Sequence, residues 1–310
     1  MILLAIVIRV PGFFDNTSSK DENVARLALA DMDVFKNVDI LVLGNSHSYS
    51  GIDPEVFFER QIGMLNYATA AAGPYAIKLC YDDYVARSGT KPKSVLINIS
   101  PAMFCEASDV FDQYPIHRFL KEPLTNEEML MKGYVSVERY FKLITKSCKR
   151  GLKNFIIAES PDKKMVKSLY ENSGYVPREG LYTDSLYKAN EKLYKSTLEK
   201  QGFDKEKARF FLDFIDGLIK ENISVILHEI PSNRYNDFFS EEMMDEYFSF
   251  YLKLDFRKDL MLYDAGMMQP TNWTEKKHFA DMDHFNINGA ILYSRVLADF
   301  LIGMKKYEKQ

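Results

Sequence analysis

The sequence is poor in cysteine, has no excess of one charge and lacks repeats. Its three cysteines, Cys80, Cys105 and Cys148, lie far apart in 310 residues and form no CxxC pair. That number fits neither a zinc knuckle nor a dense disulfide framework, so we expect three thiols rather than one disulfide. A formal net charge of −4 gives no electrostatic reason to expect nucleic acid as a partner. Low-complexity tracts and internal repeats are also missing, which excludes repeat architectures.

A long hydrophobic run is missing as well. The N-terminal "MILLAIVI" is apolar over eight residues, whereas a membrane-spanning helix needs about 20. It has neither the basic start nor the small-residue cleavage site of a complete signal peptide. It is therefore an apolar arm or edge strand, or the end of a signal anchor that starts before residue 1. The polar "DNTSSKDEN" that follows favours the truncated anchor. We expect residues 1–35 to be this arm and a linker, and we expect an extracytoplasmic protein, in the periplasm or at the cell surface, anchored in the membrane.

Five short apolar runs predict buried strands. Several are continuous rather than alternating, which is typical of parallel strands covered on both faces. Because 46% of the residues are hydrophobic, the chain can form one large domain with a substantial core. The runs are residues 39–44, 63–68, 94–100, 224–230 and 260–265.

Helical patterns separate most of these runs. They cover residues 74–89, 204–222, 240–254 and 286–307. This alternation predicts a doubly wound α/β sheet. The interval from about 104 to 203 is rich in Tyr, Lys and Glu and breaks the order, so we interpret it as a mostly helical insertion in a domain of residues 36–310. The predicted fold is a three-layer α/β/α domain with a central, parallel, five-stranded sheet.

Polar side chains follow these strands, at the edge where an open α/β sheet binds its ligands. Ser46 follows the first strand, and Asp281 and His284 follow the fifth. A serine hydroxyl needs a base within hydrogen-bond reach, and His284 is the candidate. In an Asp-x-x-His sequence the carboxylate can hold Nδ1 of the imidazole, which leaves Nε2 free to take the serine proton. The backbone N–H groups of Ser46 and Gly73 are candidate oxyanion donors.

Each of these residues also has a simpler interpretation. Ser46 alone would be a helix N-cap, and His284 alone a hydrogen-bonded loop histidine. Asp283 is an alternative orienting carboxylate, but we expect its position directly before His284 to turn it away. His278, Asp281, Asp283 and His284 together could hold zinc. The two histidines lack i, i+4 spacing, however, and Ser46 would be left unexplained, so we predict no metal and no cofactor.

Further polar residues at the strand ends are candidates for substrate contact. They are Asn45, His47, Ser100, His228 and Arg234. For His47 the alternative is capping of the following helix, and for His228 it is a hydrogen-bonded turn.

The blocks "LVLGNSHSYSGIDP" and "DMDHFNINGA" resemble the first and last blocks of the SGNH (GDSL-type) hydrolase superfamily. "LNYATAAAG" is similar to its second block, which supplies a glycine amide, here Gly73. "SVLINISPAMF" resembles the third block of the branch that contains lipoteichoic-acid D-alanylation and polysaccharide O-acyl-transfer proteins. Two departures stand out: the usual first-block aspartate is Asn45, and the third-block Gly-x-Asn-Asp is absent. We expect Asn98, inside the third strand, to be structural.

The resemblance implies a serine-dependent esterase or O-acyltransferase. It would act through an acyl-enzyme on Ser46, with an acylated extracytoplasmic polysaccharide or cell-envelope polymer as its partner. The alternative is a binding or assembly component of a polysaccharide-modification system with weak or no turnover. The missing third-block asparagine favours that alternative, and the complete Ser-His-Asp set favours the enzyme.

Overall fold

The computed structural model describes residues 26–105, 120–121, 124, 126–131, 163–183, 188, 191, 194–196, 198–232, 235–264 and 275–307. Five parallel strands form one sheet in the order β2-β1-β3-β4-β5. They are β1 (Ile40–Leu43), β2 (Met64–Asn66), β3 (Ser94–Asn98), β4 (Ser224–Glu229) and β5 (Met261–Asp264). Each lies inside a predicted run, so the predicted parallel five-stranded sheet is confirmed.

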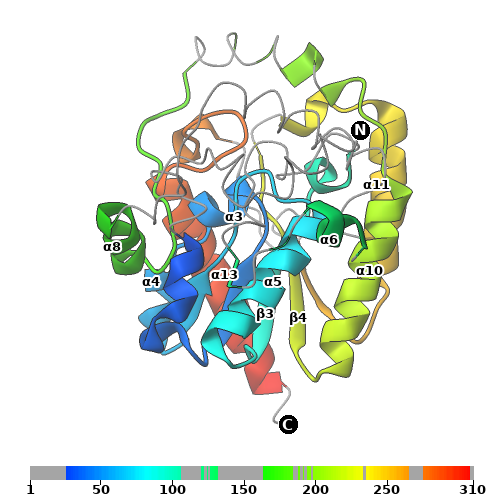
Figure 1. Ribbon diagram of the computed structural model, residues 1–310. Helices are drawn as coiled ribbons and strands as arrows, with labels where there is room; N and C mark the ends of the chain where they lie inside the picture. The colour runs from blue at the N-terminus through cyan, green and yellow to red at the C-terminus, as the bar shows by residue number, and fades with distance from the viewer. Residues whose placement is uncertain are drawn as a thin grey trace, which may run out of the picture.

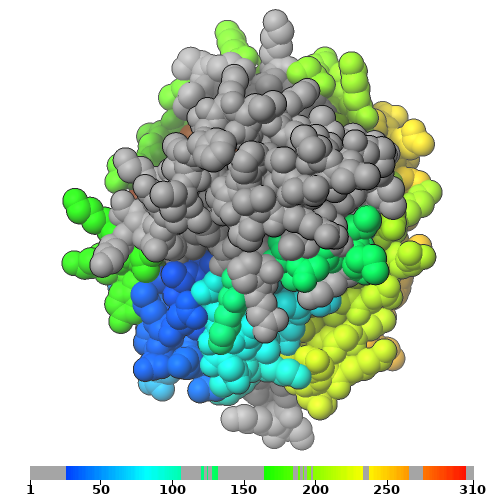
Figure 2. Space-filling view, in the orientation of Figure 1, coloured from blue at the N-terminus to red at the C-terminus, as the bar shows by residue number. Residues whose placement is uncertain are grey.

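Helices cover both faces of the sheet. One layer contains α5 (Pro74–Ser88), α10 (Lys205–Lys220) and α11 (Glu241–Asp255), which pack on alternate strand residues such as Leu41, Val95 and Leu227. The other contains α3 (Ser46–Gly51), α4 (Pro54–Phe58) and α13 (Ile287–Tyr307). Figure 1 shows α5 and α10 in front of the sheet and α13 behind it. In Figure 2 the surfaces of α5 and α10 lie side by side in the lower half of the molecule. The predicted three-layer α/β/α architecture is therefore confirmed.

Local sequence signals explain where the long helices begin and end. Asp204 caps α10 by accepting hydrogen bonds from the backbone N–H groups of Glu206 and Lys207, and Ser240 caps α11 by accepting from that of Met243. These residues satisfy donors that the first helical turn leaves unpaired. Helix α5 starts with Pro74 and ends before a left-handed glycine at position 89.

Residues 26–35, expected in the linker, pack against the sheet. They include the 3-10 helices η1 (Ala28–Asp31) and η2 (Asp33–Phe35). Leu27, Leu29 and Phe35 are buried in the core. The folded domain therefore begins no later than Arg26. The apolar arm and the whole polar stretch lie outside the described residues.

Two helices are described in the interval predicted as a helical insertion. They are α6 (Asn126–Met131) and α8 (Lys163–Glu171). The segment 172–183 that follows α8 has no regular structure and packs against the sheet. The backbone N–H of Asn66 donates to the carbonyl of Ser173 (2.9 Å). Gly174 has a φ of +86°, and a Cβ there would lie 1.9 Å from the carbonyl oxygen of Asn66, so this close approach requires glycine.

Within the described residues, one helix passes a length and composition test for crossing a membrane. It is α13 over residues 287–304, with a mean hydropathy of 1.3. Tyr293, Leu297 and Leu301 of this helix are buried against the sheet, which is the pattern of an amphipathic core helix. Cys80 and Cys105 are buried free thiols, and Cys148 lies outside the described residues.

Candidate active site

The turn after β1 places Ser46 at the start of a helix. Gly44 has a φ of +144°, and a Cβ there would lie 2.6 Å from Oγ of Ser48. Asn45, rather than Ser46, is the N-cap of α3: its Oδ1 accepts from the backbone N–H of His47 (3.0 Å). The capping role considered for Ser46 is thus filled by its neighbour. Ser46 is partly exposed, whereas the residues around it are buried, so its hydroxyl is available for chemistry.

Buried amides hold α3 against the sheet. Asn66 of β2 donates through Nδ2 to the carbonyls of Ser48 and Ile52, both at 2.9 Å. Asn98 of β3 donates to Oδ1 of Asn45 (3.3 Å) and accepts from the backbone N–H of Ile230 (3.1 Å). Both amides are fully buried. The predicted structural role of Asn98 agrees with these contacts.

The histidine lies on a loop closed by two buried rings. Phe279 and Phe285 form an isolated antiparallel bridge, and their ring centroids lie 5.0 Å apart. Asn286 donates to the carbonyls of Lys277 (2.8 Å) and Phe279 (3.2 Å). The loop tip therefore presents its three polar side chains, Asp281, Asp283 and His284, in a fixed arrangement.

The loop brings His284 to Ser46. Nε2 of His284 lies 2.8 Å from Oγ of Ser46, across 238 residues of sequence. Nδ1 of His284 lies 3.0 and 3.1 Å from the two carboxylate oxygens of Asp281. A carboxylate only accepts hydrogen bonds, so in the neutral ring Nδ1 carries the proton and Nε2 accepts from the serine hydroxyl. The contacts expected for Ser46, His284 and Asp281 are all present.

The expectation that Asp283 would turn away from His284 is wrong. Oδ1 of Asp283 lies 2.9 Å from Nδ1 of His284. The loop bends so sharply that residues i−1 and i−3 both reach the ring. The single N–H of Nδ1 has hydrogen-bond geometry toward Asp281, whereas Asp283 makes an ion-pair contact. His284 therefore faces two carboxylates.

These charges determine the protonation of the site. Burial has the largest effect on His284 and opposes its charged form, but the charge of Asp283 and the close contacts of the ring with Asp281 and Asp283 outweigh it and raise the pKa of His284 to about 9. Burial likewise opposes ionisation of Asp283, yet the contacts with His284 and His47 hold its pKa well below the ordinary value. The resting site thus favours an imidazolium at His284 beside the ionised carboxylate of Asp283.

One contributor, Arg178, has no motif or periodicity around it that would predict a role in the site. Its guanidinium donates to Oδ2 of Asp281 (3.0 Å) and to the hydroxyl of Tyr49 (3.2 Å), from 103 residues before Asp281. The backbone of the 172–183 segment is also bound to the site: Val176 donates to the carbonyl of Tyr49, and Ile287 donates to that of Arg178. Arg178 thereby fixes the carboxylate that orients His284.

The candidate oxyanion donors lie at the ends of adjacent strands. Ser46 follows β1, and Gly73 is the N-cap of α5, after β2. The backbone N–H of Thr69 donates to the carbonyl of Gly44 (3.0 Å), which joins the two turns. Within the described residues, neither the N–H of Ser46 nor that of Gly73 makes a hydrogen bond, so neither donor is taken up by another protein group there.

The residues expected to contact substrate have different positions. Asn45 and Ser100 are buried, and Nδ2 of Asn45 donates to Oγ of Ser100 (3.5 Å). The prediction for His228 is wrong: it is fully buried, its Nδ1 lies 3.0 Å from the hydroxyl of Tyr293, and burial lowers its pKa to about 3. A strand-end position did not reveal which layer its side chain enters. Arg234 lies outside the described residues.

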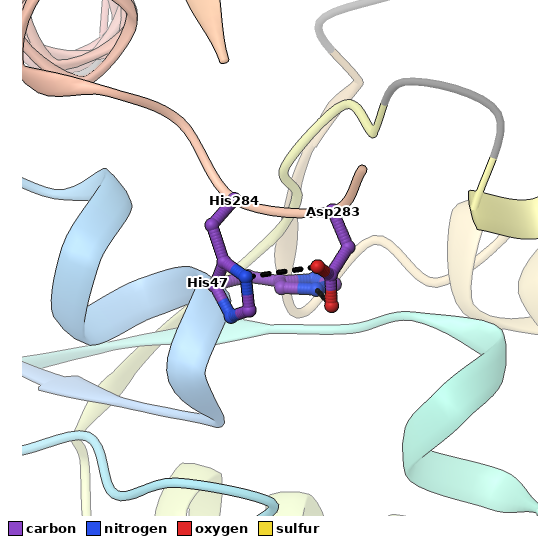
Figure 3. Close-up of side chains that lie close together, drawn as sticks. All are labelled: His47, Asp283 and His284. Atoms are coloured by element: carbon purple, nitrogen blue, oxygen red, sulfur yellow. Dashed lines mark hydrogen bonds and ion pairs between the residues drawn. The ribbon is translucent and has the colours of Figure 1, made fainter. Parts of the chain in front are cut away.

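Three described side chains have the spacing that a metal ion requires. His47, Asp283 and His284 place ligand atoms within 4.8 Å of one another. This set differs from the predicted zinc cluster, because it includes His47 and lacks His278 and Asp281. Figure 3 shows the carboxylate of Asp283 beside both imidazoles. The carboxylate of Asp283 contacts both imidazoles, and Nε2 of His284 lies 2.8 Å from Oγ of Ser46, so these ligand atoms already have protein partners.

Comparisons with known proteins found likeness only at the level of solved structures. No family model and no curated protein matches the chain. A structure assigned to the lipolytic G-D-S-L family from Desulfitobacterium hafniense aligns with a TM-score of 0.38 and 12% identity, covering 85% of this chain and 99% of the other. A structure assigned as an acylhydrolase from Bacteroides fragilis aligns with a TM-score of 0.40 and 10% identity, covering 89% and 94%. At this level of similarity neither structure carries an argument about function.

Proposed function

We propose that the protein is a serine-dependent enzyme that acts on ester bonds through an acyl-enzyme. The observation that carries the proposal is the connected series of contacts from Ser46 Oγ to His284 Nε2 and from His284 Nδ1 to Asp281. Nucleophile, base and orienting carboxylate each have the partner that nucleophilic catalysis requires. The two unoccupied N–H groups after β1 and β2 support it.

The reaction has two halves. Oγ of Ser46 attacks the ester carbonyl carbon while its proton moves to Nε2 of His284. The N–H groups of Ser46 and Gly73 bind the oxyanion, and each such donor contributes about 3–4 kcal/mol by analogy. The intermediate then releases the alcohol, which takes the proton from His284. Water, or an acceptor hydroxyl, attacks the acyl-enzyme by the same steps in reverse and frees Ser46.

For the substrate we propose an acylated extracytoplasmic polysaccharide or cell-envelope polymer. The support is the likeness of the block around Ser100, "SVLINISPAMF", to a branch that contains polysaccharide O-acyl-transfer proteins; the blocks around Ser46, Gly73 and His284 resemble the superfamily as a whole. Incubation with an O-acylated polysaccharide should release the free carboxylic acid, or transfer the acyl group to an added sugar, faster than incubation of the Ser46→Ala variant. Equal rates for the two proteins would contradict this substrate class.

A second candidate is a binding component with little turnover. The observation in its favour is that the amide of Asn98 is bonded to Asn45 and is not free to serve as a third oxyanion donor. Hydrolysis of p-nitrophenyl acetate, measured beside polysaccharide affinity, separates the two. A burst of p-nitrophenol equal to the enzyme concentration supports the enzyme, and tight sugar binding without any burst supports the binding component.

Labelling with a fluorophosphonate tests the nucleophile directly. We expect one adduct, located on Ser46 by peptide mass spectrometry, and none in Ser46→Ala. Ser48→Ala is the matched control, because this hydroxyl lies on the same helix, is buried and has no partner within the described residues. Labelling that persists in Ser46→Ala would overturn the assignment, as would unlabelled wild-type protein.

A further inference from the structure

The carboxylates of Asp281 and Asp283 both contact the imidazole of His284, but they have different further partners. Asp281 accepts from the guanidinium of Arg178 (3.0 Å) and from the backbone N–H groups of Asp283 and His284 (3.1 and 2.8 Å). Its charge is therefore shared with a permanent cation. The side chain of Asp281 is also partly exposed, at 24%. Asp281 is well placed to fix the orientation of the ring, and its effect on the proton affinity of the ring is reduced by Arg178.

Asp283 has no such cation. Its residue is 6% exposed, and within the described residues no lysine or arginine pairs with it. Oδ1 lies 2.9 Å from Nδ1 of His284 and 3.5 Å from the hydroxyl of Tyr194, and Oδ2 lies 3.3 Å from Nε2 of His47. A buried negative charge this close to an imidazole favours the imidazolium strongly, because little solvent screens it.

His47 connects this carboxylate to the serine helix. It is the residue after Ser46 on α3, and its ring packs edge-on against His284, with centroids 5.2 Å apart and an interplanar angle of 81°. Figure 3 shows Asp283 and His284 on one loop and His47 reaching them from a helix. Movement of α3 relative to the loop would therefore break the contact between His47 and Asp283 together with the one between Ser46 and His284.

We propose that Asp283 is a positioning residue that sets the pH at which His284 becomes a base, and that His47 holds Asp283 in place. The inference rests on the proposed Ser46–His284 reaction. Asp281 orients the ring, and Asp283 stabilises the imidazolium that forms when the serine proton arrives. The groups that face His284 are Ser46 and His47 from α3, Asp281 and Asp283 from its own loop, and, through these carboxylates, Arg178 and Tyr194. Asp283 is the uncompensated charge among them.

The test is the substitution Asp283→Asn, which keeps the size of the side chain and removes its charge. We expect the ascending limb of the pH profile for fluorophosphonate inactivation to shift to lower pH by about one to two units, because loss of the negative charge lowers the pKa of His284. The plateau rate should fall less than tenfold, because Asp281 still orients the ring. A limb that stays at its wild-type pH would overturn the proposal.

A second measurement does not depend on turnover. The chain has five histidines, so nitrogen-15 NMR titration can be assigned with one substitution at a time. The titration midpoint of His284 should fall in Asp283→Asn by the same amount as the kinetic limb. An unchanged midpoint contradicts the role of Asp283 even if the reaction proves to be different. Conversely, a shifted midpoint without labelling of Ser46 contradicts the proposed function alone.

Two further variants complete the design. His47→Ala should shift the midpoint in the same direction by a smaller amount, and His47→Gln, whose amide N–H can take the place of Nε2–H, should restore it. If both His47 variants leave the midpoint at its wild-type value, His47 does not hold Asp283. Glu275→Gln is the control for loss of a nearby negative charge, because Glu275 precedes the 3-10 helix η7 (Lys276–His278) and pairs with Lys277; it should change neither limb nor midpoint.

Discussion

The serine half and the histidine half of the site are held by different kinds of interaction. Ser46 lies on a helix fixed by uncharged amides, Asn66 and Asn98, that bind backbone and side-chain groups inside the sheet layer. His284 lies on a loop whose polar tip is fixed by ionised groups, Asp281 and Asp283 with Arg178. Neutral amides give a position that does not depend on pH, whereas ionised groups give both a position and a proton affinity. The nucleophile is therefore placed rigidly, and the base is both placed and tuned.

The largest expected effect lies in the charged half. Asp281→Asn replaces an acceptor by an amide that can favour the wrong imidazole tautomer, so kcat should fall about 10³- to 10⁴-fold. Thermal unfolding should change little, because the loop retains its ring pair and the contacts of Asn286. Steady-state kinetics and calorimetry on the same preparation check both parts. A loss below tenfold would show that Asp283 orients the ring, contrary to the division of roles argued above.

An intermediate effect is expected in the uncharged half. Asn66→Ala leaves the carbonyls of Ser48 and Ile52 without their buried donor, so the free energy of unfolding should fall by about 2–4 kcal/mol. Urea denaturation at several pH values measures it, and the loss should be the same at each. Asn172→Ala, which removes an exposed hydrogen bond to Ser168, is the control and should cost less than about 0.5 kcal/mol. A loss of stability that varies strongly with pH would contradict the conclusion that the serine half is held by interactions independent of pH.

The smallest effect, counted per pH unit, is a pH dependence of stability that belongs to the charged half. The pKa of His284 is about 9 in the folded protein against about 6.5 when unfolded. The stabilisation that protonated His284 gives the folded state is therefore complete below pH 6.5 and is lost as the pH rises through 9. The free energy of unfolding should fall over that range by at most about 1.4 kcal/mol per pH unit. Denaturation of His284→Gln should lack this slope, and an identical slope in both proteins would contradict the assignment.

Much of the fold could be predicted from local patterns. Continuous apolar runs predicted all five strands, and Asp204, Ser240 and Gly89 gave helix boundaries within a residue or two. The contact between Ser46 and His284 could be expected, because the two residues follow different strands and the carboxyl ends of parallel strands lie at the same edge of the sheet. Asp283 could not be assigned correctly, since its direction depends on how sharply the loop bends. Arg178 has no periodicity or motif around it, and its role depends on the path of a chain segment 103 residues away.

The approach of Gly174 to Asn66 has a consequence for how this chain can vary. From 172 to 183 the backbone is attached to β2, to the helix of the nucleophile and to the loop of the base. Adding or deleting one residue there would shift Arg178 by more than 3 Å, enough to separate it from its carboxylate. Changes in length are therefore poorly tolerated between residues 172 and 183, and this segment is as constrained as the reacting groups themselves.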